Sequence, residues 1–348
     1  MDKSIFLWEY LQETRKPIVI YGMGDGCDKI MAVCRKKGIP IQGVFASDGF
    51  VREKKVHGFP LRDYRSTKEA FGDMIVLLAF GVFRPEDLAL IQKMDRETQF
   101  FAPEVPLFGG ELFDRAYWNQ HREELDRVED MLTDPLSRKT FRSLLEYKIS
   151  GRIGPLFSCE QNRTHAFEEL VSFRRGDVFA DLGAYDGDTA LEWNRLHPDH
   201  GGILALEPNP KTFARLVKNC REIPRFWAEE AAAWSCEETL FFQEKGGRSA
   251  SVCESGKKRV RGCALDRLIP RADFIKFDVE GSEKEAIDGA KNLIRKCTPD
   301  LCISAYHRTE DLFSLPLQIK RLCPDYRVSI RHFPYVPAWD TVFFFSVR

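Results

Sequence analysis

The sequence predicts an α/β protein in which a smaller Rossmann-like domain precedes a Rossmann-like sheet of seven strands, the last of them antiparallel. Three observations support this fold class. Apolar runs of strand length alternate with segments of helical periodicity along the 348 residues. Two of these runs, over 17–26 and 178–188, lead into a glycine turn that opens a helix. The final two strands are joined by residues 334–340, too few for a crossover helix, so they should pair antiparallel.

The overall composition is that of a soluble globular protein of about two domains. Hydrophobic residues make up 43% of the chain and charged residues 30%, and the formal net charge is -1. This balance gives no reason to expect nucleic acid or an anionic membrane as a partner. The longest apolar run, over 74–83, is too short to span a bilayer, and residues 1–16 lack the order of a signal peptide. We therefore expect a cytoplasmic protein, whose oligomeric state the sequence does not indicate.

The first domain is expected to cover residues 1–110. Its predicted elements are a helix over 1–14, strands over 17–21 and 41–45 around a helix over 27–37, strands over 74–80 and 100–101, and a helix over 85–94. Asp48, after the second strand, stands where a ribose-binding acid stands in a dinucleotide-binding unit. Cys27, however, occupies the position of the third glycine of that fingerprint. The domain is therefore predicted either to bind a nucleotide or nucleotide sugar, or to keep the glycine turn for folding alone.

A helical connector over 111–175 and a second domain over 176–348 are expected to follow. The connector is rich in charged and aromatic residues and shows helical periodicity at Leu125, Val128 and Leu132. The predicted strands of the second domain cover 178–180, 203–207, 226–234, 240–243, 273–278, 300–306, 327–332 and 341–347. Helices fill the intervals, for example over 211–220 and 283–294.

Two acids follow neighbouring strands of the second domain. Asp181 ends the first strand just before Gly183 and Gly187, and Glu207 ends the next strand. Ligands of an open α/β sheet bind beyond the carboxyl ends of its strands, where Glu207 could accept two hydrogen bonds from a ribose diol. A nicotinamide cofactor would suit the same pair of features. The order Asp-Leu-Gly-Ala-Tyr-Asp-Gly, with no third glycine at the helix start, favours a different cofactor.

This half of the chain resembles the FkbM-type methyltransferases. The resemblance rests on ordered blocks over 179–188, 207–210, 275–283 and 305–312, together with Arg331-His332 and the terminal Asp340-Thr-Val-Phe. It covers about residues 177–348. It implies S-adenosylmethionine as the cofactor and methylation of an oxygen, often on a sugar or a natural product.

Cofactor-binding residues follow from the resemblance by position. Glu207 would bind the ribose, and Pro208 and Asn209 would flank the adenosine. The adenine edge would lie near the end of the third strand, where Ala232 offers backbone contacts only. The methionine part would be lined by Asp181, Gly183, Ala184, Tyr185 and Gly187.

Three side chains at the ends of later strands are the candidate catalytic residues. A hydroxyl is a poor nucleophile until its proton leaves, and a positioned base contributes about 10²–10⁴-fold to the rate. His307 is the first candidate for this base because an imidazole titrates near neutral pH, and Asp278 is the second, with Glu280 beside it. The alternatives are a buried histidine that closes a strand, and carboxylates that cap the helix starting at 281–283. A divalent ion bound by these three residues is chemically reasonable but is not expected.

The predicted function is transfer of a methyl group from S-adenosylmethionine to a hydroxyl of a sugar, glycan precursor or natural product. The expected partner is therefore a small-molecule or glycan acceptor. Two alternatives are a non-catalytic module that binds S-adenosylmethionine or a nucleotide, and an NAD-dependent oxidoreductase built on Gly22–Gly26. Arg331 and His332 are predicted either to meet an anionic group of the acceptor or to lie at the rim. The sequence shows no aromatic platform for a sugar, because its aromatic residues fall on predicted strands and helix faces.

Overall fold

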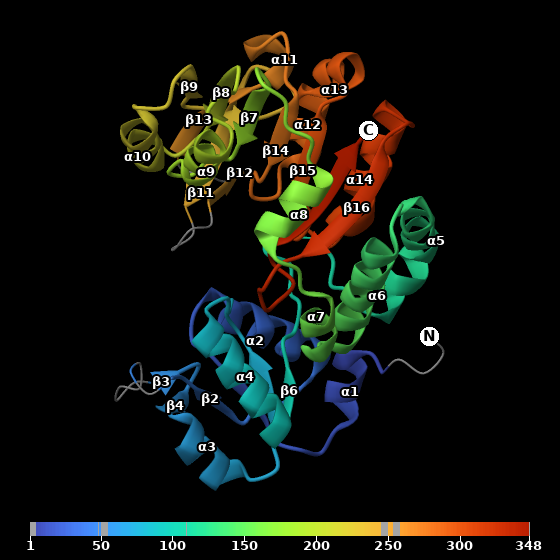
Figure 1. The fold of residues 1–348 in the computed structure, drawn as a ribbon. Coiled ribbons are helices and arrows are strands. Elements are labelled where there is room, and N and C mark those ends of the chain that lie inside the picture. The colour runs from blue at the N-terminus through green and yellow to red at the C-terminus, as the bar shows by residue number, and fades with distance from the viewer. Residues whose placement is uncertain are drawn as a thin grey trace.

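The computed structural model describes residues 5–47, 49, 55–108, 110–244, 250–252 and 258–347. Within these residues the chain forms a six-stranded sheet near the N-terminus, a seven-stranded sheet near the C-terminus, and a four-stranded sheet inserted into the C-terminal half. Figure 1 shows the six-stranded sheet below the seven-stranded one, with a group of helices beside their junction. No helix in this described part of the chain is both long and apolar enough to cross a membrane.

The six-stranded sheet has the order β3-β4-β2-β1-β5-β6 and is parallel except for β3, which pairs antiparallel with β4. Its elements are α1 (Leu7–Glu13), β1 (Ile18–Tyr21), α2 (Asp25–Lys37), β2 (Gly43–Phe45), β3 (Lys55–Val56), β4 (Phe59–Arg62), α3 (Tyr64–Phe71), β5 (Ile75–Leu78), α4 (Pro85–Glu97) and β6 (Gln99–Phe101). The β3–β4 hairpin was not predicted, because strands of two and four residues are too short to show an alternating pattern of apolar side chains. Asp48, the predicted ribose-binding acid, lies outside the described residues.

The seven-stranded sheet has the order β16-β17-β15-β14-β7-β8-β9. Its elements are β7 (Val178–Leu182), α9 (Asp188–Leu196), β8 (Gly202–Leu206), α10 (Pro210–Cys220), β9 (Phe226–Glu229), α11 (Leu265–Leu268), β14 (Phe274–Phe277), α12 (Glu283–Gly289), α13 (Lys291–Cys297), β15 (Asp300–Ser304), α14 (Asp311–Leu322), β16 (Arg327–His332) and β17 (Thr341–Ser346). β17 pairs antiparallel with both β15 and β16, which confirms the predicted antiparallel last strand.

One predicted strand is divided between two sheets. The expected strand over 226–234 ends as β9 at Glu229, and the chain then leaves the seven-stranded sheet. Ala232 and Ala233 instead form β10, which pairs with β13. The remaining strands of this smaller sheet are β11 (Glu238–Glu244), β12 (Ala250–Val252) and β13 (Lys258–Cys263). The segment does hold the third strand, as expected, but its end could not be predicted, because a segment rich in apolar residues does not show where a chain changes its hydrogen-bonding partner.

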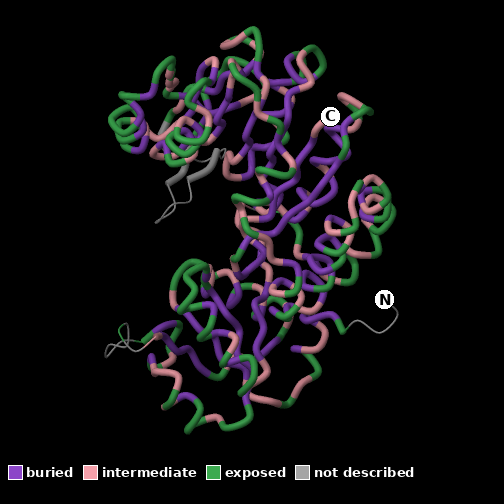
Figure 2. The backbone as a smooth tube through the Cα atoms, in the orientation of Figure 1, coloured by how far each residue is buried: buried purple, intermediate pink, exposed green. Residues whose placement is uncertain are grey.

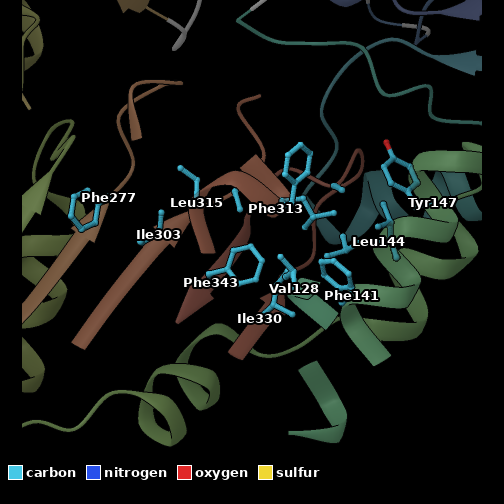
Figure 3. Close-up of a cluster of buried hydrophobic side chains, with 14 of the residues drawn as sticks. Val128, Phe141, Leu144, Tyr147, Phe277, Ile303, Phe313, Leu315, Ile330 and Phe343 are labelled. Atoms are coloured by element: carbon cyan, nitrogen blue, oxygen red, sulfur yellow. The ribbon is translucent and has the colours of Figure 1, made fainter. Parts of the chain in front are cut away.

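Four helices connect the two large sheets: α5 (Arg115–Met131), α6 (Pro135–Ser150), α7 (Gly154–Cys159) and α8 (Arg163–Leu170). Asp114 and Asp134 begin the two long helices, because each carboxylate accepts hydrogen bonds from backbone N–H groups of the first turn. Figure 3 shows Phe141 of α6 near Ile330 and Phe343 of the seven-stranded sheet. The apolar faces of α5 and α6 therefore cover one face of that sheet, whereas α8 packs against Phe274 and Phe344 on the other face.

A single cluster of buried side chains extends through both large sheets and the helices. It includes Val76 of β5, Leu144 of α6 and Phe343 of β17. Figure 2 shows that buried backbone is concentrated in the strands of both sheets. The two α/β units thus share one hydrophobic core, and burial of this common surface favours a fixed arrangement between them.

Arg331 and His332 lie in this shared interior and do not line a ligand site. Arg331 is 1% exposed, and its guanidinium lies 3.3 Å from a carboxylate oxygen of Asp134 and 2.7 Å from the Ser137 hydroxyl. The ring Nδ1 of His332 lies 3.0 Å from the Thr341 hydroxyl, and burial lowers the pKa of His332 to about 4. The prediction that these residues meet an acceptor or form a rim was therefore wrong, because β16 is covered by α6 and α7.

Replacing Asp134 with Ala should destabilise the protein by about 3–5 kcal/mol, because the buried Arg331 charge loses the nearer of its two carboxylates, with Glu169 left at 3.7 Å, and α6 loses its cap. Urea denaturation measures the change in the free energy of unfolding. Asp134→Asn separates the two contributions, since Asn keeps the cap but removes the charge. Asp126→Ala, at an exposed pair with Arg122 on α5, is the matched control and should change stability little. Equal stabilities for Asp134→Ala and Asp126→Ala would contradict the expectation.

Candidate active site

A cavity of about 1600 Å³ lies between the carboxyl ends of the two large sheets. Residues that follow β1 and β5 line one side, and residues that follow β7, β8 and β14 line the other. The carboxyl ends of parallel strands are where α/β sheets bind ligands, so both sheets direct their ligand-binding edges into the same space. A single small-molecule site usually occupies about 300–1,000 Å³, so this cavity has room for more than one molecule.

The turn between β7 and α9 forms part of the cavity wall. Gly183 has a φ of +85°, and a Cβ at this position would overlap the carbonyl oxygen of Asp278 after the neighbouring strand β14. The backbone N–H groups of Gly183 and Ala184 donate to the carbonyl oxygen of Leu206, at 3.0 and 2.9 Å. The turn is thus held between the ends of β14 and β8, and only glycine allows this close approach.

The predicted cofactor residues divide into two groups. Six of them line the cavity: Gly183, Tyr185, Glu207, Pro208, Asn209 and Ala232. The other three lie behind its wall. Asp181 is inside β7 and 0% exposed, Ala184 is buried at 1%, and Gly187 forms the N-cap of α9. The expectation that these three line the pocket directly is corrected, because their positions are enclosed by β14, β8 and α10.

Glu207 is the acid at the centre of this half of the cavity. It follows β8, is 8% exposed, and its Oε1 accepts a hydrogen bond of 2.8 Å from the Asn209 N–H. Burial raises the pKa of Glu207 to about 7. Ala232, on β10, is an apolar wall residue of the same cavity. A carboxylate, a glycine turn and small apolar side chains suit a ligand that joins an amino acid to a nucleoside.

Asp181 acts from behind the wall through Lys276, a residue that sequence analysis missed. The Lys276 ammonium lies 3.3 Å from Asp181 Oδ1 and 3.5 Å from Asp278 Oδ2. Burial alone would lower the pKa of Lys276, but the two carboxylates raise it overall. Burial would raise the pKa of Asp278, whereas Lys276 and His307 hold it below its usual value. A lysine in the middle of the apolar strand Phe274-Ile-Lys-Phe277 was the sequence signal for this network, since a buried charge needs partners.

His307 is held by a buried carboxylate on one side and faces two others. Its Nδ1 lies 2.8 Å from Glu283 Oε1, and its Nε2 lies 3.8 Å from both Asp278 Oδ1 and Glu280 Oε2. Because a carboxylate can only accept, Nδ1 carries a proton and Glu283 fixes the ring orientation. Glu283 is the first residue of α12 and is 1% exposed. Sequence analysis did not assign it, although it stands three residues after Glu280.

The charges around His307 perturb one another. Burial would lower the pKa of His307, but Glu283, Glu280 and Asp278 raise it to about 10. Burial raises the pKa of Glu280 to about 7. Glu280 has a φ of 55°, a left-handed conformation that is uncommon outside glycine and is enriched at functional sites. Among the residues that the structure describes, no group of three or more His, Cys, Asp or Glu side chains is arranged to hold a metal ion.

The segment after β6 closes the cavity over this cluster. Phe108 lines the cavity, and its ring lies edge-on to the His307 ring with centroids 5.6 Å apart. The Tyr306 hydroxyl donates to Asp278 Oδ1 at 3.3 Å. His307 is 2% exposed as a result. The His307–Glu283 pair is therefore shielded from bulk water, which strengthens its electrostatic interaction, whereas Asp278 and Glu280 stay 31% and 37% exposed.

The glycine turn after β1 faces the same cavity, but packing accounts for its shape. A Cβ at Gly26 would overlap the carbonyl oxygen of Ala79, so glycine allows α2 to pack against the end of β5. Asp25 places a carboxylate at the start of α2, which opposes binding of a pyrophosphate there. Lys29, one turn later, pairs with Asp25 at 3.0 Å. No contact at this turn favours a separate dinucleotide site.

The strand order, with its antiparallel last strand, is that of the Rossmann-like sheet found in S-adenosylmethionine-dependent methyltransferases, and the glycine turn and Glu207 lie at the edge where such a sheet binds its ligand. Residues 181–328 match the family described as Methyltransferase FkbM domain, so the C-terminal half of the chain carries this domain and the resemblance is confirmed.

The known proteins that are similar to the chain include a curated methyltransferase and a solved structure. Hexuronic acid methyltransferase AglP of Haloferax volcanii is 26% identical over 137 residues, which cover 36% of this chain and 55% of that protein. The chain thus spans about half the length of this curated relative. The crystal structure of Methyltransferase FkbM from Methylobacillus flagellatus KT has a TM-score of 0.76 and 19% identity, over 98% of this chain and 94% of that one. The fold of both sheets and their connection therefore recurs in another protein.

Proposed function

We propose that this protein transfers a methyl group from S-adenosylmethionine to a hydroxyl oxygen of a sugar, glycan precursor or natural-product acceptor. One observation carries the proposal: Glu207 and the Gly183 turn line the same cavity as His307, whose ring is held from behind by Glu283. The name of the Haloferax relative, a hexuronic acid methyltransferase, supports a sugar acceptor.

The cofactor would be held by the wall built from the ends of β7 and β8. When bound, S-adenosylmethionine supplies an activated methyl group. Glu207 would accept hydrogen bonds from the ribose hydroxyls, and the Gly183–Tyr185 backbone would contact the amino-acid part. Ala232 would lie against the adenine. Asp181 would act indirectly, by holding Lys276 and through it the carboxylate of Asp278.

His307 would act as the base that takes the acceptor's hydroxyl proton. Glu283 holds the proton on Nδ1, so Nε2 is the nitrogen that would receive one. Because the surrounding carboxylates raise the pKa of His307 to about 10, Nε2 is protonated near neutral pH, and His307 acts as a base only in the fraction of molecules that has lost this proton. The rate of methyl transfer should therefore rise as the pH rises toward 10. The imidazolium formed in this way would be stabilised by Asp278 and Glu280, whose oxygens lie 3.8 Å from Nε2. Asp278 stays ionised in this arrangement because Lys276 and His307 lower its pKa. Asp278 is the second candidate for the base.

Two measurements test the proposal. Isothermal titration calorimetry with S-adenosylhomocysteine should show binding at one site per chain. Incubation with labelled S-adenosylmethionine and a panel of hexoses, hexuronic acids and nucleotide sugars should then transfer label to an acceptor hydroxyl. No heat of binding and no thermal shift with intact protein would overturn the donor half of the proposal. Transfer to a nitrogen or carbon atom would overturn the acceptor half.

The titration of His307 is a further expected result. Its imidazole should lose its proton near pH 10, far above the usual value of 6.5, because three carboxylates surround it. The stability that this charge contributes is complete below pH 6.5 and is lost as the pH rises through 10, because the raised pKa belongs to the folded state. Histidine-selective NMR follows the seven imidazoles, and His307→Gln assigns the resonance. Glu283→Gln should lower the pKa. A titration near 6.5 in the wild type would contradict the expected charge cluster.

A further inference from the structure

One part of the cavity wall is built jointly from one loop of each large sheet. The loop after β5 contributes Phe80, and the loop between β16 and β17 contributes Tyr335 and Trp339. Neither loop belongs to the β7, β8 and β14 edge that carries the cofactor residues. This wall therefore lines the part of the cavity that the proposed donor site leaves to a second molecule.

The two loops are joined by backbone hydrogen bonds. Val82 and Val336 form an isolated antiparallel bridge, with N···O distances of 2.7 Å in one direction and 2.9 Å in the other. Both valines are buried, at 2% and 0% exposure. The aromatic side chains that flank the bridge are therefore carried on a rigid support, which is what a preorganised binding surface requires.

Three aromatic side chains line this part of the cavity, and we call them the junction platform: Phe80, Tyr335 and Trp339. The Phe80 ring packs edge-on against Tyr21, with centroids 4.8 Å apart. The Tyr335 and Trp339 centroids lie 5.7 Å apart. Both rings lie over Gly81, where an added Cβ would be 2.6 Å from the Tyr335 hydroxyl and 2.7 Å from a ring carbon of Trp339. Phe80 is 36% exposed, and Tyr335 and Trp339 are half-buried. Large rings exposed together in a cavity indicate a ligand surface more than a packing defect.

The junction platform lies next to the proposed base. β15 and β17 pair with Ser304 opposite Val342, and the Ala305 N–H donates to the Thr341 carbonyl at 2.9 Å. The chain segments that continue from these ends carry His307 on one strand and Trp339-Asp340 on the other. Burial raises the pKa of Asp340, and the nearby charge of Asp278 contributes to the shift.

Charged groups border the rings. The Arg163 guanidinium lies 3.6 Å from Asp340 Oδ1, and both side chains line the cavity. A pyranose ring has one face of C–H groups and a rim of hydroxyls. Its apolar face matches flat aromatic rings, and its rim matches a pair that offers both donors and an acceptor. A flat aromatic or purely aliphatic ligand would make no hydrogen bond to Arg163 or Asp340, so the charged pair matches a hydroxyl-bearing ligand better.

We infer that the junction platform is the acceptor subsite, and that it binds the apolar face of a pyranose ring so that a ring hydroxyl is directed to His307. This inference rests on the proposed methyl transfer to a hydroxyl. It assigns the six-stranded sheet a role in acceptor recognition, through Phe80 and the Gly81 contact, instead of a separate nucleotide site. It also corrects the view from sequence that no aromatic platform exists.

Saturation-transfer NMR tests the platform directly. The probes are the methyl glycosides of glucose, galactose, mannose and glucuronic acid, each with full-length protein and S-adenosylhomocysteine. Saturation of the protein's aromatic protons should reach the ring protons of at least one glycoside. In Trp339→Leu and Phe80→Leu the saturation transfer to the glycoside should fall at least about tenfold, as expected when a ring contact of ~1.4 kcal/mol is lost. Gly81→Ala should weaken it too, by displacing both rings.

Matched controls separate this inference from the proposed function. Trp227→Leu on β9 and Phe241→Leu on β11 remove exposed rings, at 55% and 43% exposure, that do not line the cavity, and should leave the transfer unchanged. Calorimetry with S-adenosylhomocysteine should give the wild-type affinity for every platform variant. The inference would be overturned if saturation reached none of the four glycosides, or if it reached them equally in the platform variants and the control variants. Loss of S-adenosylhomocysteine binding in the wild type would instead overturn the proposed function.

Discussion

Replacing His307 with Gln should slow methyl transfer by about 10²–10⁴-fold, the usual contribution of a positioned general base. Binding of S-adenosylhomocysteine should change only a few-fold, because His307 belongs to the acceptor side of the cavity. The expectation follows from the geometry of the ring, whose Nδ1 is held by Glu283 at 2.8 Å and whose Nε2 faces Asp278 and Glu280. Single-turnover rates with labelled cofactor measure the chemical step.

Glu283→Gln is the companion variant for this base. It keeps the shape of the side chain but removes the charge that orients and stabilises the protonated ring, so a similar loss in rate is expected. The double variant should be little slower than either single one, because the two residues act as a unit. His200→Gln, at a histidine buried to 1% exposure and hydrogen-bonded to Asn194, is the matched control. Full activity in both His307→Gln and Asp278→Asn would show that the base lies elsewhere.

Glu207→Gln should weaken S-adenosylhomocysteine binding by about 10- to 100-fold, because a hydrogen bond to a charged group contributes roughly 1.5–3 kcal/mol. In the wild type the affinity should also fall as the pH drops through 7. The reason is that burial raises the pKa of Glu207 to about 7, so acidification removes the carboxylate that accepts from the ribose. The Gln variant should lack this dependence. Calorimetry at several pH values measures both effects.

Glu229→Gln provides the control for this prediction. Glu229 ends the adjacent strand β9, pairs with Arg261 at 3.0 Å, and does not line the cavity. Its replacement should leave the affinity and its pH dependence unchanged. If Glu207→Gln binds S-adenosylhomocysteine as tightly as Glu229→Gln does, the proposed ribose contact is wrong.

The placement of Gly183 and Glu207 on one wall of the cavity could be predicted from sequence because both features are local. Gly183 and Glu207 each follow a strand directly, and parallel strands bring their carboxyl ends to one edge without further information. The position of Asp181 was less predictable, since an acid at the end of a strand points into the cavity or away from it. The structure directs it to Lys276 behind the wall.

The acceptor side depends on contacts that no local pattern contains. Phe80 and Trp339 occur in loops far apart in the sequence, and each by itself is an ordinary apolar residue next to a strand. They share a wall only because Val82 pairs with Val336. Arg331 is a second case, in which a predicted site residue is buried. It is covered by α6, a helix that lies nearly two hundred residues earlier in the sequence. The positions of Phe80, Trp339 and Arg331 thus depend on how distant segments of the chain pack together, which no short sequence pattern records.

The Val82–Val336 bridge also limits how the specificity of such an enzyme can change. Residues 80–83 and 334–340 form one recognition module that is encoded in two separate places in the gene. A graft that exchanges only one loop would pair a foreign segment with the resident one, and its rings would no longer meet over Gly81. Acceptor range should therefore be transferable between relatives only when both segments are exchanged together, and natural variation at the two segments should be correlated.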